Sequence, residues 1–296
     1  MSAIRGRVRG LPEWDRCAVM GVVNVTPDSF SDGGRWFDTE AAIKRGLDLL
    51  AQGADLVDVG GESTRPGATR VDEPEEIRRV LPVVRALAAE GAVVSVDTMR
   101  ASVAERAVRA GARLVNDVSG GRADPAMVPV VAAEGVPFVV MHWRGQSADM
   151  NDRAVYRRVV PEVLAELRQS LDAAVAGGID PESLIVDPGL GFAKTAPHDL
   201  ELIAGLGQLH ALGRPLLVAA SRKRFLGTVL ADADGTPPPA RDRDAATAAI
   251  TTLAAHAGAW AVRVHEVAAS ADAVRVVRAV RDQRGVSDPP PAPGAG

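Results

Sequence analysis

The feature that most constrains the fold of this sequence is a regular alternation of short valine-rich runs with alanine-rich amphipathic stretches. Such alternation is typical of a parallel sheet with crossover helices. Eight repeats favour a closed barrel over an open sheet. The predicted strands cover 19–25, 55–60, 92–96, 113–118, 137–141, 184–186, 215–219 and 261–264. The predicted helices cover 40–51, 75–89, 101–110, 127–134, 156–176, 199–209, 245–257 and 271–281.

We therefore predict one α/β domain, a single (β/α)8 TIM barrel with its active site at the C-terminal ends of the strands. The barrel is expected over residues 17–284, after an N-terminal extension at 1–16. Residues 235–244 are interpreted as a long loop before a helix, not as a domain break. The proline-, glycine- and alanine-rich tail at 285–296 has almost no bulky apolar residue and is expected to be disordered.

Composition excludes several classes of partner. A net charge of −4 and an aromatic content of 3% argue against a nucleic-acid-binding surface, so small molecules are the expected partners. A single cysteine, Cys17, excludes an intramolecular disulfide and fits a reducing compartment. No signal peptide or membrane-spanning run is evident, so we expect a cytoplasmic protein without membrane contact.

Polar or glycine-rich residues follow all eight predicted strands, and a barrel brings these ends to one face. Asp97 ends a run that is apolar enough to be buried on both sides, where an unpaired carboxylate is costly. One interpretation is that Asp97 caps the helix that follows it. Capping explains individual strand ends, but it explains eight such ends poorly.

Two chemical groups can be separated among these residues. Asp97, Asn116, Asp187 and Lys223 are hydrogen-bonding groups at the ends of apolar strands, and together they suit a flat heterocycle with several ring nitrogens and an amino group.

The second group is suited to an anion. Arg222, Arg263 and His265 are donors for a phosphate or pyrophosphate, with Asn24 nearby in barrel order. A magnesium ion would share the pyrophosphate, because Mg²⁺ favours few protein ligands together with phosphate oxygens.

Two other motifs are less informative. The stretch PGLGFAKT is similar to a phosphate-binding loop, but Ala193 replaces the glycine expected before Lys194 and the spacing is wrong. His142 follows a predicted strand, and its residue type leaves ligand contact and packing both open.

Several segments together resemble the dihydropteroate synthase family, the folate-pathway transferases that sulfonamide drugs inhibit. The segments are MGVVNVTPDSFSDGG, VDVGGESTRPGA, SVDT, VNDVSGG, MH, DPGLGFAK, SRKRFLG and VRVHEV, spread over residues 20–267. The resemblance implies a (β/α)8 barrel, usually a homodimer, that joins 6-hydroxymethyl-7,8-dihydropterin pyrophosphate to para-aminobenzoate and releases pyrophosphate. The alternatives are a pterin-binding methyltransferase and a non-catalytic pterin-binding paralogue.

The resemblance also implies roles for individual residues. The implied pterin site consists of Asp97, Asn116, Met141, Asp187, Arg222 and Lys223. The implied pyrophosphate site consists of Asn24, Arg263 and His265, with Mg²⁺ at Asn24. The implied para-aminobenzoate site consists of Thr64, Pro66, Phe192, Lys223 and Arg224. Asp32 is implied to lie near the reacting carbon and to act in catalysis with Lys223, Arg263 and His265.

Overall fold

Eight parallel strands form the centre of the molecule in this computed structural model, which describes residues 6–26, 35–62, 71–145 and 152–287. The strands are β1 (Ala18–Asn24), β2 (Leu56–Gly60), β3 (Val94–Asp97), β4 (Leu114–Asp117), β5 (Phe138–Met141), β6 (Leu184–Asp187), β7 (Leu217–Val218) and β8 (Ala261–Val264). They pair in the order β6-β5-β4-β3-β2-β1-β8-β7. A parallel bridge between Val186 and Leu216 joins β6 to β7 and closes the ring. The predicted TIM barrel is therefore confirmed.

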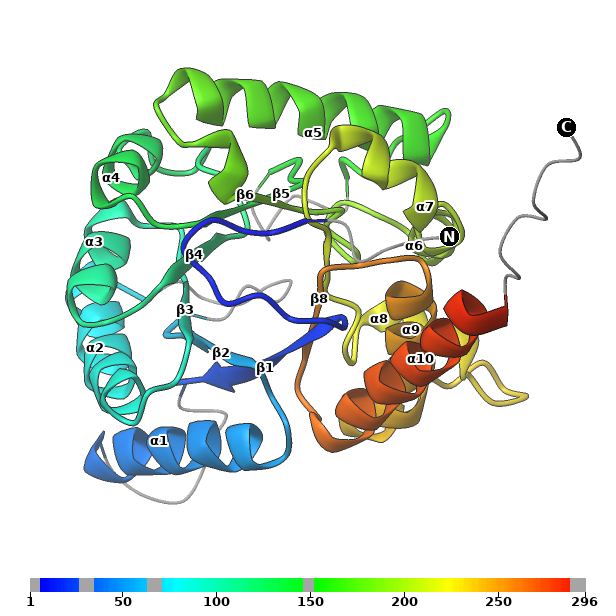
Figure 1. Cartoon of the computed structure of the whole chain (residues 1–296), viewed down its shortest axis with the longest axis horizontal. Coiled ribbons are helices and arrows are strands. Elements are labelled where there is room, and N and C mark those ends of the chain that lie inside the picture. Colours follow the sequence, from blue (N-terminus) through cyan, green and yellow to red (C-terminus); the bar gives the residue numbers. More distant parts are fainter. Residues whose placement is uncertain (1–5, 27–34, 63–70, 146–151, 288–296) are drawn as a thin grey trace, which may run out of the picture.

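Helices surround this barrel, as Figure 1 shows. They are α1 (Arg35–Ala51), α2 (Glu73–Ala89), α3 (Ala101–Arg109), α4 (Met127–Glu134), α5 (Val159–Ala176), α6 (Ala196–Ala204), α7 (Leu206–Leu209), α8 (Arg224–Val229), α9 (Asp244–His256) and α10 (Ala268–Ser287). No helix in the described ranges is long and apolar enough to cross a membrane.

The C-terminal half of the barrel differs from the sequence-based assignment in the following ways. The helix expected over 199–209 is divided at Gly205 into α6 and α7. The short helix α8 was not predicted, and a 3-10 turn, Ala240–Arg243, precedes α9 within the expected long loop. Helix α10 continues to Ser287, into the first residues of the expected tail, and residues 288–296 lie outside the described part.

The inner layer of the barrel is apolar at the N-terminal ends of the strands, which form the bottom of the barrel. Its buried members are Ala18, Met20, Leu56, Leu114, Val139, Ile185, Leu217 and Ala261. Val8, Leu11 and Trp14 of the N-terminal segment pack against this layer, and the ring of Trp14 lies 5.8 Å from that of Trp260. Figure 1 shows this dark-blue segment crossing the near end of the barrel. The N-terminal residues therefore cover the barrel bottom.

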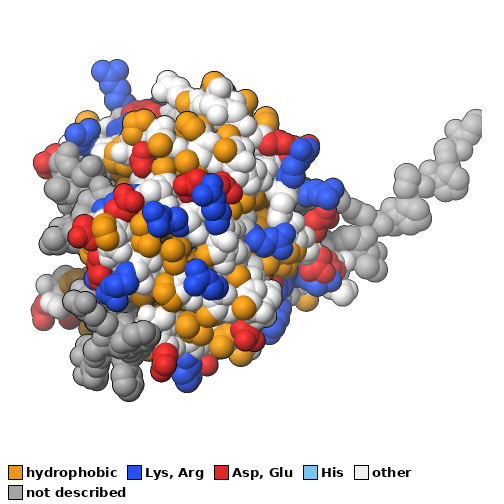
Figure 2. Space-filling model, turned by 90° about the vertical axis from the view of Figure 1, so that its left-hand side faces the viewer, with side chains coloured by type: hydrophobic (Ala, Val, Ile, Leu, Met, Phe, Trp, Pro, Cys, Tyr) orange, Lys and Arg blue, Asp and Glu red, His pale blue; other side chains and the backbone are white. Residues whose placement is uncertain are grey.

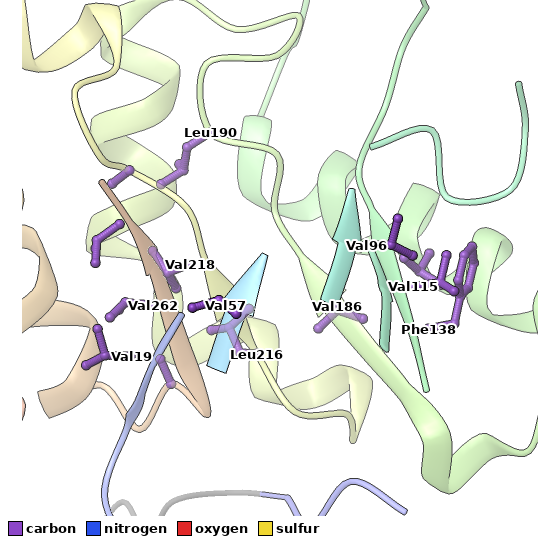
Figure 3. Packing of buried hydrophobic residues seen from close by; sticks show 14 of the residues in the cluster. Val19, Val57, Val96, Val115, Phe138, Val186, Leu190, Leu216, Val218 and Val262 are labelled. Carbon is purple, nitrogen blue, oxygen red and sulfur yellow. The ribbon is translucent and has the colours of Figure 1, made fainter. Parts of the chain in front are cut away.

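A second layer lies between the strands and the helices. Successive side chains on a strand point to opposite faces, so the residues that alternate with the inner layer face the helices. Figure 3 shows labelled members of this layer: Val19, Val57, Val96, Val115, Phe138, Val186, Leu190, Leu216, Val218 and Val262. Because both faces of each strand are buried, the strands appear in the sequence as continuous apolar runs and not as alternating ones.

The outer surface carries charges of both signs. Figure 2 shows the face at the left of Figure 1, where arginine and lysine side chains lie among aspartate and glutamate. A mixed face of this kind does not produce the single-signed field that attracts a polyanion.

Candidate active site

The positions of the site residues on the strands follow from the alternation of side chains, which point to opposite faces of a strand in turn. On β7 a count in steps of two leads from Leu217 to the apolar Ala219. On the other seven strands the same count from the inner layer leads to a polar or sulfur-containing side chain near the C-terminal end. These positions are Asn24, Asp58, Ser95, Asp97, Asn116, Met141, Asp187 and Arg263, with His265 just beyond β8. Strand register places Asn24, Gly60, Asp97 and Asn116 in one row across β1 to β4. The barrel thus brings the predicted residues of several strands to the same end.

Arg263 is the centre of a buried ion-pair network. Its Nε donates to Oδ2 of Asp58 at 2.6 Å, and its Nη2 donates to Oδ2 of Asp97 at 2.6 Å. The Asn116 amide donates to the same Asp58 oxygen at 2.9 Å. Asp58 has no exposed surface, and Asp97 and Asn116 are 8% and 5% exposed. One arginine from β8 therefore links acids on β2 and β3.

The carboxyl group of Asp97 has an unusually high pKa. Burial raises the pKa of the Asp97 carboxyl to about 7, although the positive charge of Arg263 acts in the opposite direction. Helix α3 is capped differently, because the N–H of its first residue, Ala101, donates to Asp124 at 2.8 Å. The interpretation of Asp97 as a helix cap is therefore wrong. Asp97 faces the barrel interior and Arg263.

Asp187 and Lys223 lie at the same end of the barrel, where the charge of each affects the pKa of the other. Oδ1 of Asp187 accepts the N–H of Gly189 at 2.7 Å, and burial raises the pKa of this carboxyl. Burial lowers the pKa of the Lys223 ammonium to about 8, with the charge of Asp187 opposing the shift. The ammonium donates to the Leu190 carbonyl and lies 4.9 Å from the ring centre of Phe192. Lys223 therefore lies against an aromatic ring and within the electrostatic influence of an acid.

His265 is fixed from two sides. Its backbone N–H and its Nδ1 both lie within hydrogen-bond distance of the Ser221 hydroxyl, at 3.1 and 3.0 Å. Its carbonyl accepts from Nη2 of Arg45 at 2.7 Å. The half-buried ring is thus held at the end of β8, next to Arg263.

The remaining predicted residues are distributed more widely. Met141 is buried at the end of β5, beside Asp187 in the strand register. Arg222 forms a bidentate ion pair with Asp244 at 2.7 and 2.6 Å, and Arg224 is an exposed residue at the start of α8. Asp32, Thr64 and Pro66 lie outside the described residues.

A magnesium site was predicted at Asn24. No cluster of three or more His, Cys, Asp or Glu side chains in the described ranges could hold a metal ion. Asn24 ends β1 with a half-buried amide, which offers one neutral oxygen. A single oxygen donor suits Mg²⁺ that takes most of its remaining ligands from phosphate and water. The residues present therefore fit a metal that arrives with a phosphorylated substrate.

His142 belongs to a buried network that the sequence did not reveal. Its Nε2 lies 3.0 Å from Glu166, and its Nδ1 lies 3.0 Å from the buried ammonium of Lys194. Burial, reinforced by the charge of Lys194, lowers the pKa of His142 to about 4, so the ring is neutral at pH 7. Burial likewise lowers the pKa of Lys194 to about 7. The question left open for His142 is resolved in favour of packing and hydrogen bonding within the protein.

Lys194 has a visible structural role. Its ammonium donates to the carbonyls of Gly189 at 2.9 Å and Phe192 at 3.0 Å, which fixes the turn that carries Phe192.

Asp58 is another residue that the sequence analysis did not identify. The available signal was an acid in the middle of the apolar run LVDVG, on the same face as Gly60. Period-two counting from Leu56 would have found it.

Comparison with known proteins identifies the family. The model of the family described as pterin binding enzyme matches residues 20–265. The dihydropteroate synthase of Mycobacterium leprae is 58% identical over 262 residues, covering 88% of this chain and 92% of that protein. The enzyme of Bacillus subtilis is 41% identical over 273 residues, covering 92% and 91%. The chain belongs to the dihydropteroate synthase family. The suspected resemblance is thereby confirmed, and both alternative functions are less well supported.

Solved structures of dihydropteroate synthases agree with the fold. The Xanthomonas albilineans enzyme with 4-aminobenzoic acid superimposes with a TM-score of 0.84 at 45% identity, covering 93% of this chain and 95% of that one. The Yersinia pestis enzyme in complex with a sulfonamide drug gives a TM-score of 0.86 at 38% identity, covering 94% and 99%. A further structure of the Xanthomonas albilineans enzyme contains 7,8-dihydropteroate.

The raised pKa of Asp97 predicts a specific pH dependence of stability. The folded-state pKa of about 7 lies above the ordinary value of 3.8, so folding favours the protonated carboxyl. Its stabilising contribution is complete below about pH 4 and is lost as the pH rises towards 7. The substitution Asp97→Asn removes this dependence. From pH 5 to pH 8, the wild-type free energy of unfolding should therefore fall relative to that of the variant by about 1 kcal/mol or more.

Urea titration of both proteins at the two pH values measures this difference. Asp242→Asn, at an exposed position, controls for the loss of one negative charge. A wild-type-to-variant difference that is the same at pH 5 and pH 8 would contradict the assignment of Asp97.

Proposed function

We propose that this chain joins 6-hydroxymethyl-7,8-dihydropterin pyrophosphate to para-aminobenzoate, giving 7,8-dihydropteroate and pyrophosphate. The observation that carries the proposal is the convergence of two buried acids, Asp97 and Asp187, with the Asn116 amide and the Lys223 ammonium at the carboxyl end of the barrel. The names of the relatives and the ligands of the solved structures support the same reaction.

Pterin recognition follows from the chemistry of these four groups. A pterin presents an amino group and ring N–H donors together with a carbonyl and ring-nitrogen acceptors. The carboxylates accept from the donors, whereas Lys223 and Asn116 donate to the acceptors. Because Asp97, Asn116 and Asp187 are buried, a ligand that fails to match them leaves a desolvated polar atom at a cost of about 1–3 kcal/mol. Met141 and the aliphatic stem of Arg222 would line the ring.

The pyrophosphate end is assigned to Asn24, Arg263 and His265. As the methylene C–O bond breaks, its electron pair leaves on the pyrophosphate, and donors aimed at that oxygen lower the barrier. Asn24 would hold Mg²⁺, which when bound supplies positive charge to neutralise the leaving group. The para-aminobenzoate nitrogen bonds to the methylene carbon and releases a proton to solvent. Asp32 would stabilise the positive charge that develops on the pterin.

Lys223 would contact both substrates. Its ammonium would bind the pterin, and the same ammonium lies 4.9 Å from the ring centre of Phe192, in the region assigned to para-aminobenzoate with Thr64, Pro66 and Arg224. An added Cβ on Gly191 would lie 3.1 Å from Cδ of Lys223, so the glycine leaves room for the lysine stem. The site is therefore shaped around a lysine.

We also propose that the enzyme is a homodimer through α9 and α10. These helices pack against each other, and Leu253, Val276 and Val280 on them are 52%, 60% and 49% exposed. A two-fold interface places the same apolar patch of two copies face to face. A second copy would thus remove these side chains from water.

The enzyme is also proposed to act in the cytoplasm. The free thiol of Cys17, which is buried, fits a reducing compartment of this kind.

Pyrophosphate release is the direct test of the reaction. Purified protein should release pyrophosphate from the dihydropterin substrate in amounts equal to the dihydropteroate formed, and only when para-aminobenzoate and Mg²⁺ are both present. Turnover that is independent of para-aminobenzoate would contradict the proposed synthase activity.

Lys223→Arg should lower the catalytic efficiency almost as much as Lys223→Ala. Arginine keeps the charge, but its broad planar head cannot occupy the space that Gly191 leaves for a narrow stem. We expect kcat/KM for both substrates to fall about 10²-fold or more in each variant, by analogy with other single electrostatic deletions. Lys44→Arg, at an exposed position that pairs with Asp48 at 2.7 Å, should be silent. A near-normal kcat/KM for Lys223→Arg would show that positive charge alone suffices.

The proposed dimer predicts a solution mass of twice the 30.8 kDa chain. Val276→Asp should shift this mass to that of a single chain, because the new carboxylate would be buried at the interface. Light scattering after gel filtration measures both, with Val155→Asp as a control at a residue that is 76% exposed on a loop. A wild-type protein with the mass of one chain would contradict the proposal.

A further inference from the structure

We propose that Arg243 and Asp244, at the start of α9, are positioning residues that hold the Arg222–Lys223 segment in the conformation needed to present Lys223 to the substrates. This inference rests on the proposed function of Lys223. It adds two residues from a helix that contributes no side chain to the substrate sites assigned above.

The segment adopts a backbone conformation that requires support. Arg222 has a φ of 59°, in the left-handed region that residues other than glycine rarely adopt. Such a conformation is strained and persists only where the surrounding structure enforces it. Lys223 follows directly and is the N-cap of α8, so the direction of its side chain depends on this peptide.

Three side chains at the start of α9 provide the support. The hydroxyl of Thr247 accepts the N–H of Arg222 at 3.2 Å. Nη1 of Arg243 donates to the carbonyls of Arg222 and Lys223 at 3.3 and 3.2 Å. Asp244 holds the guanidinium of Arg222 through two hydrogen bonds, and this pairing raises the pKa of Arg222. Both peptides that flank the strained residue are therefore bound by one helix.

Arg243 is itself fixed. Its Nε and Nη2 donate to the Pro238 carbonyl at 3.0 and 2.7 Å. Its guanidinium also lies close to Gly227 of α8, where an added Cβ would lie 2.6 Å from Cζ of Arg243. Gly227 thus provides the space that the Arg243 guanidinium occupies.

The functional consequence is geometric. The described hydrogen bonds of Arg243 all go to backbone carbonyls, so it acts through the segment and not on a substrate. A displacement of about 1 Å in a catalytic group can reduce rates about 10²-fold. Loss of the Arg243 contacts would therefore misplace the Lys223 ammonium while leaving its charge unchanged.

Gly227→Ala is the most discriminating variant. The added methyl group must displace the flexible Arg243 guanidinium, while alanine in place of glycine favours the helical conformation of α8. This gain in helix propensity offsets stability lost with the displaced Arg243 contacts, so the variant should stay folded and unfold near the wild-type temperature. We expect kcat/KM for the dihydropterin substrate to fall about 10-fold or more, with a raised KM. Arg243→Met and Asp244→Asn should shift the same parameters in the same direction.

Matched controls are available in the same turn. Arg241→Met and Asp242→Asn change exposed neighbours of the same chemistry and should retain wild-type kinetics. A wild-type kcat/KM in Gly227→Ala and Arg243→Met would overturn the inference, as would a loss of activity that only matches a loss of thermal stability. The wild-type enzyme is measured in the same assay. Its failure to release pyrophosphate would contradict the proposed function, whereas normal kinetics in the variants would contradict only the positioning role.

Discussion

The ion-pair network of Arg263 with Asp58 and Asp97 is the interaction on which the site depends. Two carboxylates this deeply buried would be costly to desolvate without the cation that pairs with both of them. A paired charge in the interior contributes little net stability, because desolvation offsets the attraction. We therefore infer that the network serves to orient hydrogen-bond donors and acceptors. Burial of the surrounding apolar layers offsets the free energy of desolvating its charges.

The barrel makes this arrangement possible. Its lower inner layer is filled by aliphatic side chains and covered by the N-terminal segment, so water is excluded from below. The same inward-facing positions become polar towards the strand ends. The residues that follow β7 and β8 then add Lys223 and His265, which contact Leu190 and Ser221 from neighbouring connections. Fold and site are thus two parts of one side-chain pattern.

Much of this pattern could be predicted from the sequence. The valine-rich runs located all eight strands, because strands buried on both faces are continuous and apolar. Asp97, Asn116 and Asp187 could be located because each is a polar residue at the end of such an apolar run. Asp58 was missed because it lies within a run and not after it. The pairing of Arg222 with Asp244 and the packing of Arg243 against Gly227 depend on tertiary geometry, which no local pattern encodes.

The central claim is that the buried network orients the pterin-binding groups, and binding to an Asp58→Asn variant tests it most directly. Asp58 has no exposed surface, so the substitution reaches the ligand through its neighbours: Arg263 and Asn116, which it binds, and Asp97, on which its charge acts. Calorimetry with the dihydropterin pyrophosphate should show an affinity at least about 10-fold weaker than wild type, or about 1.4 kcal/mol. An affinity within twofold of wild type would contradict the account.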